Sequence, residues 1–174
     1  MTGLQTPIRE SYWVVPGRFL AGEYPGSFEA QTARWRVGAF LEAGINAFID
    51  LTQPGELVPY EPILEQEAET RGLKISYQRF PIRDGGLPAP ELAARTLDAI
   101  DNAMDAGKQV YVHCWGGVGR TGTIIGCHLV RHGLSGQQAL DRIAQWWAQS
   151  PKLVRYPRSP ETDQQVRFIL DWRE

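Results

Sequence analysis

Several features that mark other classes of protein are scarce or missing in this chain of 174 residues. It has two cysteines, too few for the disulfide framework of a small secreted domain. No apolar run approaches the roughly eighteen residues of a membrane-spanning helix, and residues 1–9 hold no apolar stretch of signal-peptide length. The net charge of -2 provides no general attraction to nucleic acid or to an anionic membrane surface. We therefore expect no nucleic-acid partner and no membrane span.

What the chain does have is the composition of an ordinary folded domain. Hydrophobic residues make up 43% and charged residues 22% of the sequence, which is typical of globular proteins. A length of 174 residues is enough for a hydrophobic core and suits one compact unit, so we expect a single domain over residues 1–174. Both Cys114 and Cys127 are expected to be free thiols, which favours a reducing compartment such as the cytoplasm.

Short apolar runs alternate with longer amphipathic stretches, and glycine or proline stands at most junctions, which indicates an α/β domain. Residues 12–15 and 19–21 predict a hairpin at a sheet edge, because Pro16-Gly17 separates them. A last helix is expected to open at Ser159-Pro160, with the serine as its cap, and to end at Trp172. The other expected elements are strands at 46–51, 74–80 and 109–113, the last being the most buried, and helices at 29–43, 60–71, 89–106, 120–132 and 135–149.

The residue types that carry chemistry are concentrated in residues 110–122, where an apolar strand leads through a glycine-rich loop into a helix. Three glycines among five residues let the backbone turn tightly, so that successive N–H groups can point at one place beside the positive start of the helix. A phosphate-sized anion suits such a cradle. The predicted phosphate-binding residues are Trp115, Gly116, Gly117, Val118, Gly119 and Arg120.

Cys114 is the predicted nucleophile of this loop. Its sulfur would lie beneath the loop amides and near the Arg120 cation, and both favour thiolate over thiol. Arg120 can hold two phosphoryl oxygens with its planar guanidinium, which a lysine reproduces less well. A nucleotide-binding loop is a poor alternative, because Arg120 replaces its lysine and Cys114 replaces its first glycine.

Asp84 is the predicted general acid. A leaving alkoxide or phenoxide needs a proton as its bond to phosphorus breaks, and the same carboxylate can later take a proton from the hydrolytic water. Asp84 stands thirty residues before Cys114, in a loop expected at residues 81–88. The alternative is that Asp84-Gly85-Gly86 is simply a tight turn.

Other residues near the loop are expected to support it. Thr121 can donate its hydroxyl to the sulfur as it leaves, or can merely cap the helix. His113 precedes the nucleophile on an alternating strand, so its ring should point away from phosphate and brace the loop by hydrogen bonding. The Trp115 ring either shapes the pocket rim or covers a helix. Cys127 is expected to pack as a small hydrophobe, with a disulfide to oxidised Cys114 as the alternative.

Several remaining polar and aromatic residues are expected to have no role in the site. Three aspartates should cap elements or be solvated. Three basic residues before the last helix should form a solvated surface, with contact to the acidic flanks of a phosphopeptide as the alternative. Two adjacent tryptophans follow the helical period of a packing face, which favours the core. These residues are, in that order, Asp50, Asp98 and Asp101; Lys152, Arg155 and Arg158; and Trp146 and Trp147.

The segment His113-Cys114-x-x-Gly117-x-Gly119-Arg120-Thr121-Gly122 resembles the active-site loop of the protein-tyrosine phosphatase superfamily. The short chain and residues 17–25 are similar to its compact dual-specificity branch. The resemblance implies a central, mostly parallel sheet flanked by helices and hydrolysis of phosphate monoesters through a cysteinyl-phosphate, with no metal and no cofactor. It also places the acid in a loop such as that of Asp84.

Gln165 resembles the glutamine that orients the hydrolytic water in larger tyrosine-specific members of this superfamily. Glu161 stands where those members usually carry a first glutamine. A plain surface helix is therefore at least as good an interpretation.

Three functions are compatible with this pattern. The favoured one is a phosphatase that hydrolyses phosphotyrosine in a protein or peptide partner, with phosphoserine and phosphothreonine as further substrates. The second is an inositol phosphate or phosphoinositide phosphatase, whose loop often contains lysines that Trp115, Gly116 and Val118 do not supply. The third is a non-catalytic phosphate-binding module, which would have no need to retain the Cys114 nucleophile.

Overall fold

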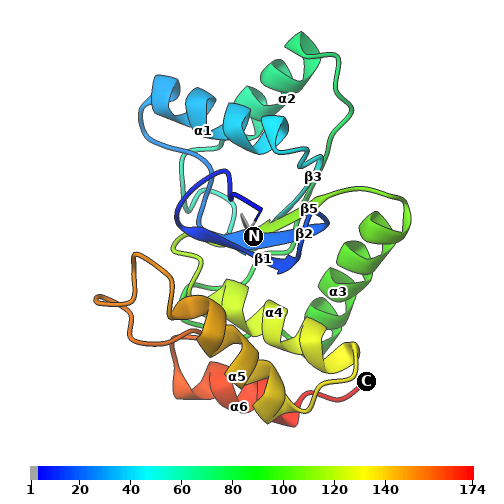
Figure 1. The fold of residues 1–174 in the computed structure, drawn as a ribbon, viewed down its shortest axis with the longest axis vertical. Helices are drawn as coiled ribbons and strands as arrows, with labels where there is room; N and C mark the ends of the chain where they lie inside the picture. Colours follow the sequence, from blue (N-terminus) through cyan, green and yellow to red (C-terminus); the bar gives the residue numbers. More distant parts are fainter. Residues whose placement is uncertain (1–3) are drawn as a thin grey trace.

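The computed structural model describes residues 4–174. No signal peptide is expected in residues 1–9, and the first three of these residues lie outside the described part. Residues 4–174 form six helices around a five-stranded sheet (Figure 1). The elements in chain order are β1 (Ser11–Val15), β2 (Phe19–Gly22), α1 (Ala30–Glu42), β3 (Ala47–Asp50), α2 (Glu61–Thr70), β4 (Ser76–Arg79), α3 (Pro90–Asp105), β5 (Val110–His113), α4 (Gly119–Arg131), α5 (Gly136–Trp147) and α6 (Asp163–Asp171).

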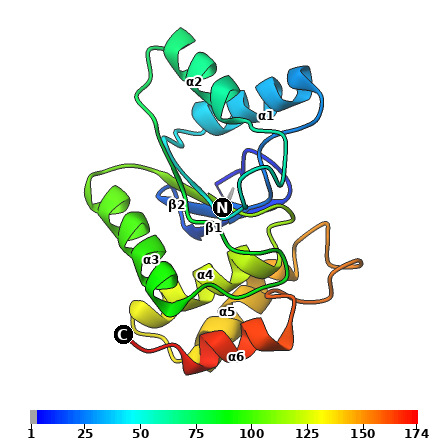
Figure 2. The ribbon, with the colours of Figure 1, turned by 180° about the vertical axis from the view of Figure 1, so that it is seen from behind.

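The strand order is β1-β2-β5-β3-β4. The hairpin of β1 and β2 is antiparallel and lies at one edge, as the sequence predicts, while β2–β5, β5–β3 and β3–β4 are parallel. Helices α1 and α2 cover one face, and α3, α4, α5 and α6 cover the other, which is plain from opposite sides in Figures 1 and 2. The expected α/β class, with a mostly parallel sheet flanked by helices, is confirmed. None of the helices formed by residues 4–174 combines the length and the hydrophobicity that a membrane crossing requires.

Strand β5 lies in the middle of the sheet and is completely buried. Its four residues, Val-Tyr-Val-His, each have 0% exposure. Val110 and Val112 pack into the core under α3–α6, whereas Tyr111 packs into the core under α1 and α2. Successive side chains of a strand point to opposite faces, so one short apolar strand supports both cores. The expectation of a deeply buried strand at 109–113 is confirmed.

The register of the parallel strands brings four strand ends to one level. His113 is paired with Gly22 on one side and with Asp50 on the other, and Asp50 is paired with Arg79. The loops that follow β2, β3, β4 and β5 therefore meet at a single edge of the sheet. In open α/β sheets this is the edge at which ligands bind.

The predicted start of the last helix is wrong. Helix α6 begins at Asp163, and its cap is Thr162, whose hydroxyl accepts a hydrogen bond from Gln165 N at 3.1 Å. The Gln165 side chain accepts one in return from Thr162 N at 3.1 Å, which completes a capping box. Ser159 is unavailable as a cap, because its buried hydroxyl donates to Val118 O at 2.7 Å at the start of α4.

Candidate active site

The loop after β5 is held tightly against the backbone that follows β2. Cys114 is 3% exposed at its start, and Gly117 N donates to Cys114 Sγ at 3.3 Å. Gly117 has φ +73°, and a Cβ there would lie 2.5 Å from the carbonyl carbon of Gly22. Tyr24 N also donates to Trp115 O at 2.9 Å. Glycine is required at 117 both by its backbone angle and by the lack of space.

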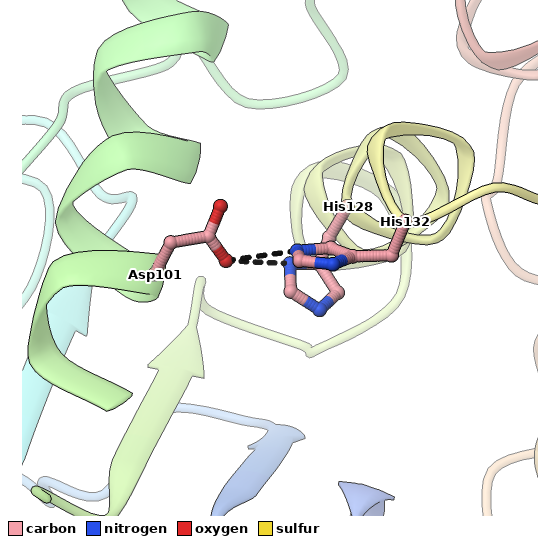
Figure 3. A group of neighbouring side chains, drawn as sticks. All are labelled: Asp101, His128 and His132. Atoms are coloured by element: carbon pink, nitrogen blue, oxygen red, sulfur yellow. Dashed lines mark hydrogen bonds and ion pairs between the residues drawn. The ribbon is translucent and has the colours of Figure 1, made fainter. Parts of the chain in front are cut away.

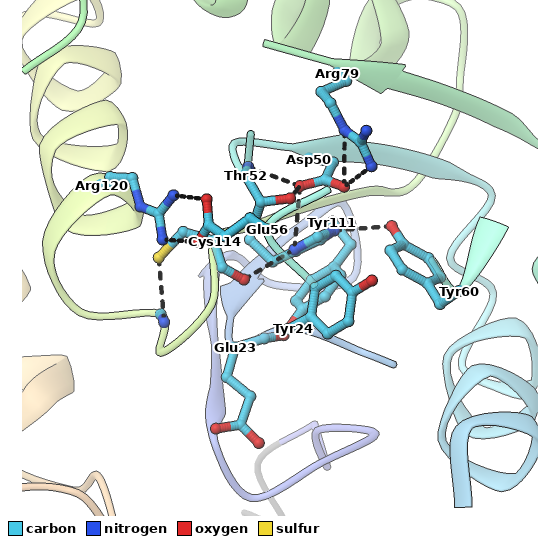
Figure 4. Close-up of polar contacts among 12 residues, drawn as sticks. Glu23, Tyr24, Asp50, Thr52, Glu56, Tyr60, Arg79, Tyr111, Cys114 and Arg120 are labelled. Carbon is cyan, nitrogen blue, oxygen red and sulfur yellow. Dashed lines mark hydrogen bonds and ion pairs between the residues drawn. The ribbon is translucent and has the colours of Figure 1, made fainter. Parts of the chain in front are cut away.

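Arg120, in the first turn of α4, is buried and paired in two places with Glu56 (Figure 4). Its Nη1 lies 2.9 Å from Glu56 Oε2 and its Nη2 lies 2.7 Å from Glu56 Oε1, and Nη1 also donates to Ile82 O at 3.0 Å. Burial by itself would lower the pKa of Arg120, but the hydrogen bonds to Glu56 and the negative charges around the guanidinium together outweigh burial and raise it. Burial would raise the pKa of Glu56, and Arg120 instead lowers it. Both side chains are therefore charged.

Glu56 is a site residue that the sequence interpretation missed. It lies in the loop after β3, the strand next to β5. A buried guanidinium needs a carboxylate partner, so a buried Arg120 implies that an acidic residue lies beside it. With twenty acidic residues in the chain, that inference alone does not say which one it is.

Asp84 lies at the mouth of the same site. Its Oδ1 is 3.1 Å from Arg120 Nη2, and its side chain is 64% exposed. The loop is also a tight turn, since Gly85 has φ +68° and Gly86 N donates to Arg83 O at 2.9 Å. The two interpretations of this segment are compatible, because the turn holds the carboxylate beside Arg120.

A cavity of about 460 Å³ joins these groups. Cys114, Asp84 and Arg120 all line it, so the structure brings the three predicted residues together. Trp115 is 59% exposed and also lines the cavity, so its ring lies at the rim and does not cover a helix. The remaining lining residues are Glu23, Gly116, Val118, Gly119, Pro151, Lys152, Arg155, Tyr156 and Glu161.

His113 is buried at the end of β5 and contacts the backbone of the loop. The His113 ring makes a hydrogen bond of 3.1 Å from Nδ1 to the carbonyl oxygen of Cys114, and that oxygen can only accept. Nδ1 therefore carries the proton, and Nε2 accepts from the Tyr60 hydroxyl at 2.8 Å. Burial lowers the pKa of His113 in spite of the nearby Asp50 carboxylate, so the ring is neutral.

The expectation that Asp50 is solvated or a simple cap is wrong. Its side chain is 0% exposed at the end of β3 and accepts hydrogen bonds from Thr52 Oγ1 at 2.7 Å, Tyr77 OH at 2.6 Å and Arg79 Nη2 at 3.1 Å. Burial would raise the pKa of Asp50, but His113 and these hydroxyl donors together lower it. The carboxylate is buried because the register sets it between His113 and Arg79.

Thr121 follows Arg120 in α4, and its donation to the departing sulfur stays a prediction. Its hydroxyl is buried, and nothing between residues 4 and 174 makes a hydrogen bond with it, Cys114 Sγ included. The side chain follows Arg120 into the first turn of α4.

Gln165 is not on a plain surface helix. Its side chain is 0% exposed, and its Nε2 donates to Gly86 O at 3.2 Å in the Asp84 loop. A Cβ on Gly119 would lie 2.9 Å from the same amide nitrogen. Gln165 therefore connects α6 to the start of α4 and to the turn that carries Asp84.

The basic segment is only partly solvated. Lys152 Nζ donates to Gly116 O at 2.7 Å and is paired with Glu23, which contradicts the expectation of a free surface residue. Arg155 lines the cavity. Arg158 is 52% exposed and pairs with Asp163, as a surface residue does.

Cys127 and the two adjacent tryptophans pack in or against the hydrophobic core. Cys127 is a free thiol with 0% exposure in the main core, and burial raises its pKa, so it is a poor nucleophile. Trp147 is buried, and Trp146 stacks on Tyr12 with a centroid distance of 5.5 Å. Their predicted packing role is confirmed.

Comparison with known sequences and structures identifies relatives of this chain. The family model described as "PTP-SAK: Swiss Army Knife protein, DSP-PTPase phosphatase domain" matches residues 8–169. Over 135 residues the chain is 45% identical to the dual specificity protein phosphatase CDC14B of Mus musculus, which covers 69% of this chain and 24% of that protein. The chain spans between 19% and 65% of the length of the first three curated relatives that it matches.

Solved structures show the same fold. Tk-PTP in its active form superimposes with a TM-score of 0.74 at 23% identity, covering 95% of this chain and 98% of that chain. The core catalytic domain of the PP-IP phosphatase Siw14 from S. cerevisiae, in complex with citrate, gives a TM-score of 0.64 at 19% identity, covering 94% and 85%. At these identities the likeness concerns the fold.

Proposed function

Since the chain belongs to the dual-specificity phosphatase (DSP-PTPase) family of the protein-tyrosine phosphatase superfamily, we propose that it is a cysteine-dependent phosphatase that hydrolyses phosphotyrosine and other phosphate monoesters in proteins. The observation that carries this proposal is that Cys114, Arg120 and Asp84, which come from two separate loops and a helix, line one cavity.

In the proposed first step, the Cys114 thiolate attacks phosphorus. An S–P bond forms, the ester P–O bond breaks, and the leaving oxygen takes a proton from Asp84. Arg120 holds two phosphoryl oxygens through N–H groups that Glu56 does not occupy. Arg120 Nε is buried and has no hydrogen-bond partner among residues 4–174, and Nη2 has a second hydrogen that Glu56 does not use, with Asp84 Oδ1 3.1 Å from this nitrogen. A bound phosphoryl group would use both donors and release Asp84 from Arg120.

In the proposed second step, water attacks the phosphorus of the cysteinyl-phosphate. Asp84 accepts a proton from this water, the S–P bond breaks, and the sulfur leaves as a thiolate. The Thr121 hydroxyl would turn to donate to the departing sulfur, which its unpaired state supports. Gln165 is buried beside Gly119 and the Asp84 loop, so its proposed role is to hold these two segments together.

The charge of the cavity favours a phosphoprotein over an inositol polyphosphate. Its basic residues are Arg120, Lys152 and Arg155, and its acidic residues are Glu23, Asp84 and Glu161, so the described lining has no excess of cations. Lys152 is already paired with Glu23. A substrate with several phosphates needs surplus positive charge, and one phosphoryl group does not.

A neighbouring cavity of about 240 Å³ supports a peptide substrate. It shares Glu23 and Trp115 with the site. Its other lining residues include the apolar and aromatic Tyr24, Phe28, Leu57 and Val58 as well as the polar Ser27 and Arg36. Phe28 is 91% exposed. An apolar side chain beside the phosphorylated residue would fit this second cavity.

The decisive experiment is a turnover assay with phosphotyrosyl and phosphoseryl peptides and with inositol polyphosphates at matched concentrations. We expect the phosphopeptides to be preferred, and Cys114→Ser to abolish turnover while phosphate binding stays measurable, because Arg120 and the loop amides remain. Preference for the polyphosphates would favour the second candidate, which the likeness to a PP-IP phosphatase keeps open. Unchanged activity of Cys114→Ser would refute the mechanism, and no turnover of any substrate would favour the binding module.

The mechanism requires Cys114 in its reduced form. The proposal therefore includes a reducing compartment, such as the cytoplasm.

A further inference from the structure

A second group of polar side chains lies between α3 and α4 (Figure 3), and none of its residues lines the cavity of Cys114. It consists of Asp101 on α3 and of His128 and His132, which are four residues apart at the end of α4. Asp101 Oδ1 lies 2.9 Å from His132 Nε2 and 3.6 Å from His128 Nδ1. One ligand atom from each residue lies within 4.8 Å of the others. All three residue types are metal ligands, and an i, i+4 histidine pair presents both rings on one face of a helix.

The buried atom His128 Nδ1 needs a hydrogen-bond partner or a ligand in this cluster. The His128 side chain is 4% exposed, and in the described part of the chain its Nδ1 has no hydrogen-bond partner. The 3.6 Å to Asp101 Oδ1 is too long for a hydrogen bond. A buried polar atom without a partner is costly and is a sign of a missing ligand. The Nδ1 atom of a neutral imidazole can supply a lone pair to a metal ion.

The two carboxylate oxygens of Asp101 are used differently. Oδ2 accepts a hydrogen bond from Arg131 at 3.1 Å, whereas Oδ1 faces the two imidazoles. Arg131 is also paired with Asp98 at 2.9 Å and with Glu174. The positive charge of Arg131 is thus already balanced by other carboxylates. Arg131 contacts Oδ2 of Asp101 and does not compete for Oδ1.

The spacing of the cluster suits a small tetrahedral ion. Bonds of about 2.0–2.1 Å from Zn²⁺ to nitrogen or oxygen place two ligands of a tetrahedron about 3.4 Å apart. The observed oxygen–nitrogen distances of 2.9 and 3.6 Å lie on either side of that value. His132 is 51% exposed, so a fourth position is open to water.

We propose that Asp101, His128 and His132 form a binding site for one divalent transition-metal ion of the Zn²⁺ type, which links α3 to α4. The ion is structural, because His132, the C-cap of α4, lies twelve residues after Arg120, which corresponds to a rise of about 18 Å along the helix. It would stabilise the carboxyl end of the helix whose first turn carries Arg120. Without metal, the cluster is an Asp101–His132 hydrogen bond beside a buried imidazole.

The test is isothermal titration of tag-free protein with Zn²⁺, together with thermal unfolding with and without the metal. All variants carry Cys114→Ser, because a reactive thiolate would bind zinc independently. We expect one ion per chain and a rise in the unfolding midpoint. Asp101→Asn and His132→Ala should each weaken binding by about tenfold or more and abolish that rise.

Asp98→Asn is the matched control. Asp98 is on the same helix and also pairs with Arg131, but it does not belong to the cluster. It should bind zinc like the parent protein. The rise is measured from the metal-free midpoint of each variant, so that a lost hydrogen bond is not mistaken for lost metal. The proposal is overturned if the Cys114→Ser protein binds no zinc, or if Asp101→Asn and His132→Ala bind it as tightly as Asp98→Asn does.

Discussion

At the residue scale, the site depends on buried charges that are matched in pairs. Arg120 is surrounded by the carboxylate of Glu56, the carbonyl of Ile82 and the carboxylate of Asp84. Because Glu56 and Ile82 already fix the guanidinium, only Asp84 has to move away from Arg120 when a phosphoryl group arrives. The contributions of Glu56 and Asp84 to catalysis can be measured separately by substitution. Glu56 holds Arg120, whereas Asp84, on our proposal, transfers a proton.

For Asp84, we expect the effect of substitution to depend on the leaving group. Asp84→Asn should slow formation of the cysteinyl-phosphate from a phosphotyrosine ester by about 100-fold, because a general acid contributes at least that much. An ester with a very acidic leaving group needs no proton and should lose little. Rapid-mixing measurement of the burst phase isolates this step. Equal losses on both esters would remove Asp84 from the role of acid.

Substitution of Glu56 should lower activity because Arg120 loses its fixed position, and not because a negative charge is removed. Glu56→Gln should lower kcat/KM by about tenfold to 100-fold, because the guanidinium loses its bidentate partner and its fixed direction. Glu161→Gln is the control, since it removes a negative charge from the lining of the cavity that Arg120 faces, without touching the Glu56 pair. Steady-state kinetics should show little loss in that control. A similar fall in both variants would mean that cavity charge alone is responsible.

At the element scale, the loop after β5 acts as a rigid connection between a buried strand and α4. Its carbonyl at Cys114 is held by His113, its carbonyl at Gly116 by Lys152 and its carbonyl at Trp115 by Tyr24 N. These contacts come from three different segments of the chain. The shape of the loop is therefore a property of the assembled sheet edge.

The two neighbouring glycines of this loop should respond differently to alanine. Gly117→Ala should destabilise the protein by about 1–3 kcal/mol and abolish most activity, because of the positive φ and of the 2.5 Å approach to Gly22. Gly116→Ala should have little effect on stability, because its Cβ would have nothing closer than Val118 Cγ2 at 3.5 Å. Urea unfolding of the two variants provides the comparison. Equal destabilisation would contradict this account of the loop.

At the scale of the whole molecule, one sheet supports a core on each face, and strand β5 contributes to both. We accordingly expect residues 1–174 to unfold as a single domain in one transition. Separate transitions in a urea titration followed by two probes would contradict a single domain.

Stability should fall as the solution becomes acidic. The pKa of His113 is lowered by burial from its ordinary value of 6.5, so its contribution to stability is complete above pH 6.5 and is lost as pH falls toward the folded value. His128 acts in the same direction, since burial lowers its pKa to about 4. Asp50 adds a further loss below its ordinary value of 3.8, because its pKa is lowered in the folded state.

The measurement is the free energy of unfolding in urea between pH 7.5 and 4, with a chelator present. His113→Asn should reduce the slope of stability with pH between 6.5 and 5, whatever its effect on stability at pH 7. The slope should not vanish, because His128 remains. An unchanged slope would show that His113 is not held neutral in the folded protein.

The sequence by itself determined the features that are local along the chain. The order of strands and helices, the edge hairpin and the glycine-rich turn from strand to helix all follow from patterns a few residues long. The carriers of the predicted chemistry, Cys114 and Arg120, are six residues apart, and one turn and one helix start suffice to bring them together. For that reason the loop could be predicted before the fold was known.

The tertiary structure alone decided which distant side chains are partners. Glu56 reaches Arg120, Asp50 is buried beside His113, and Gln165 meets Gly86 only because the strand order β2-β5-β3-β4 and the packing of α6 bring those segments together. The cluster of Asp101 and the two histidines likewise depends on α3 packing against α4. Such pairings leave no periodic trace in the sequence, because they are selected by the free-energy cost of leaving a buried charged or polar group without a partner in the completed fold.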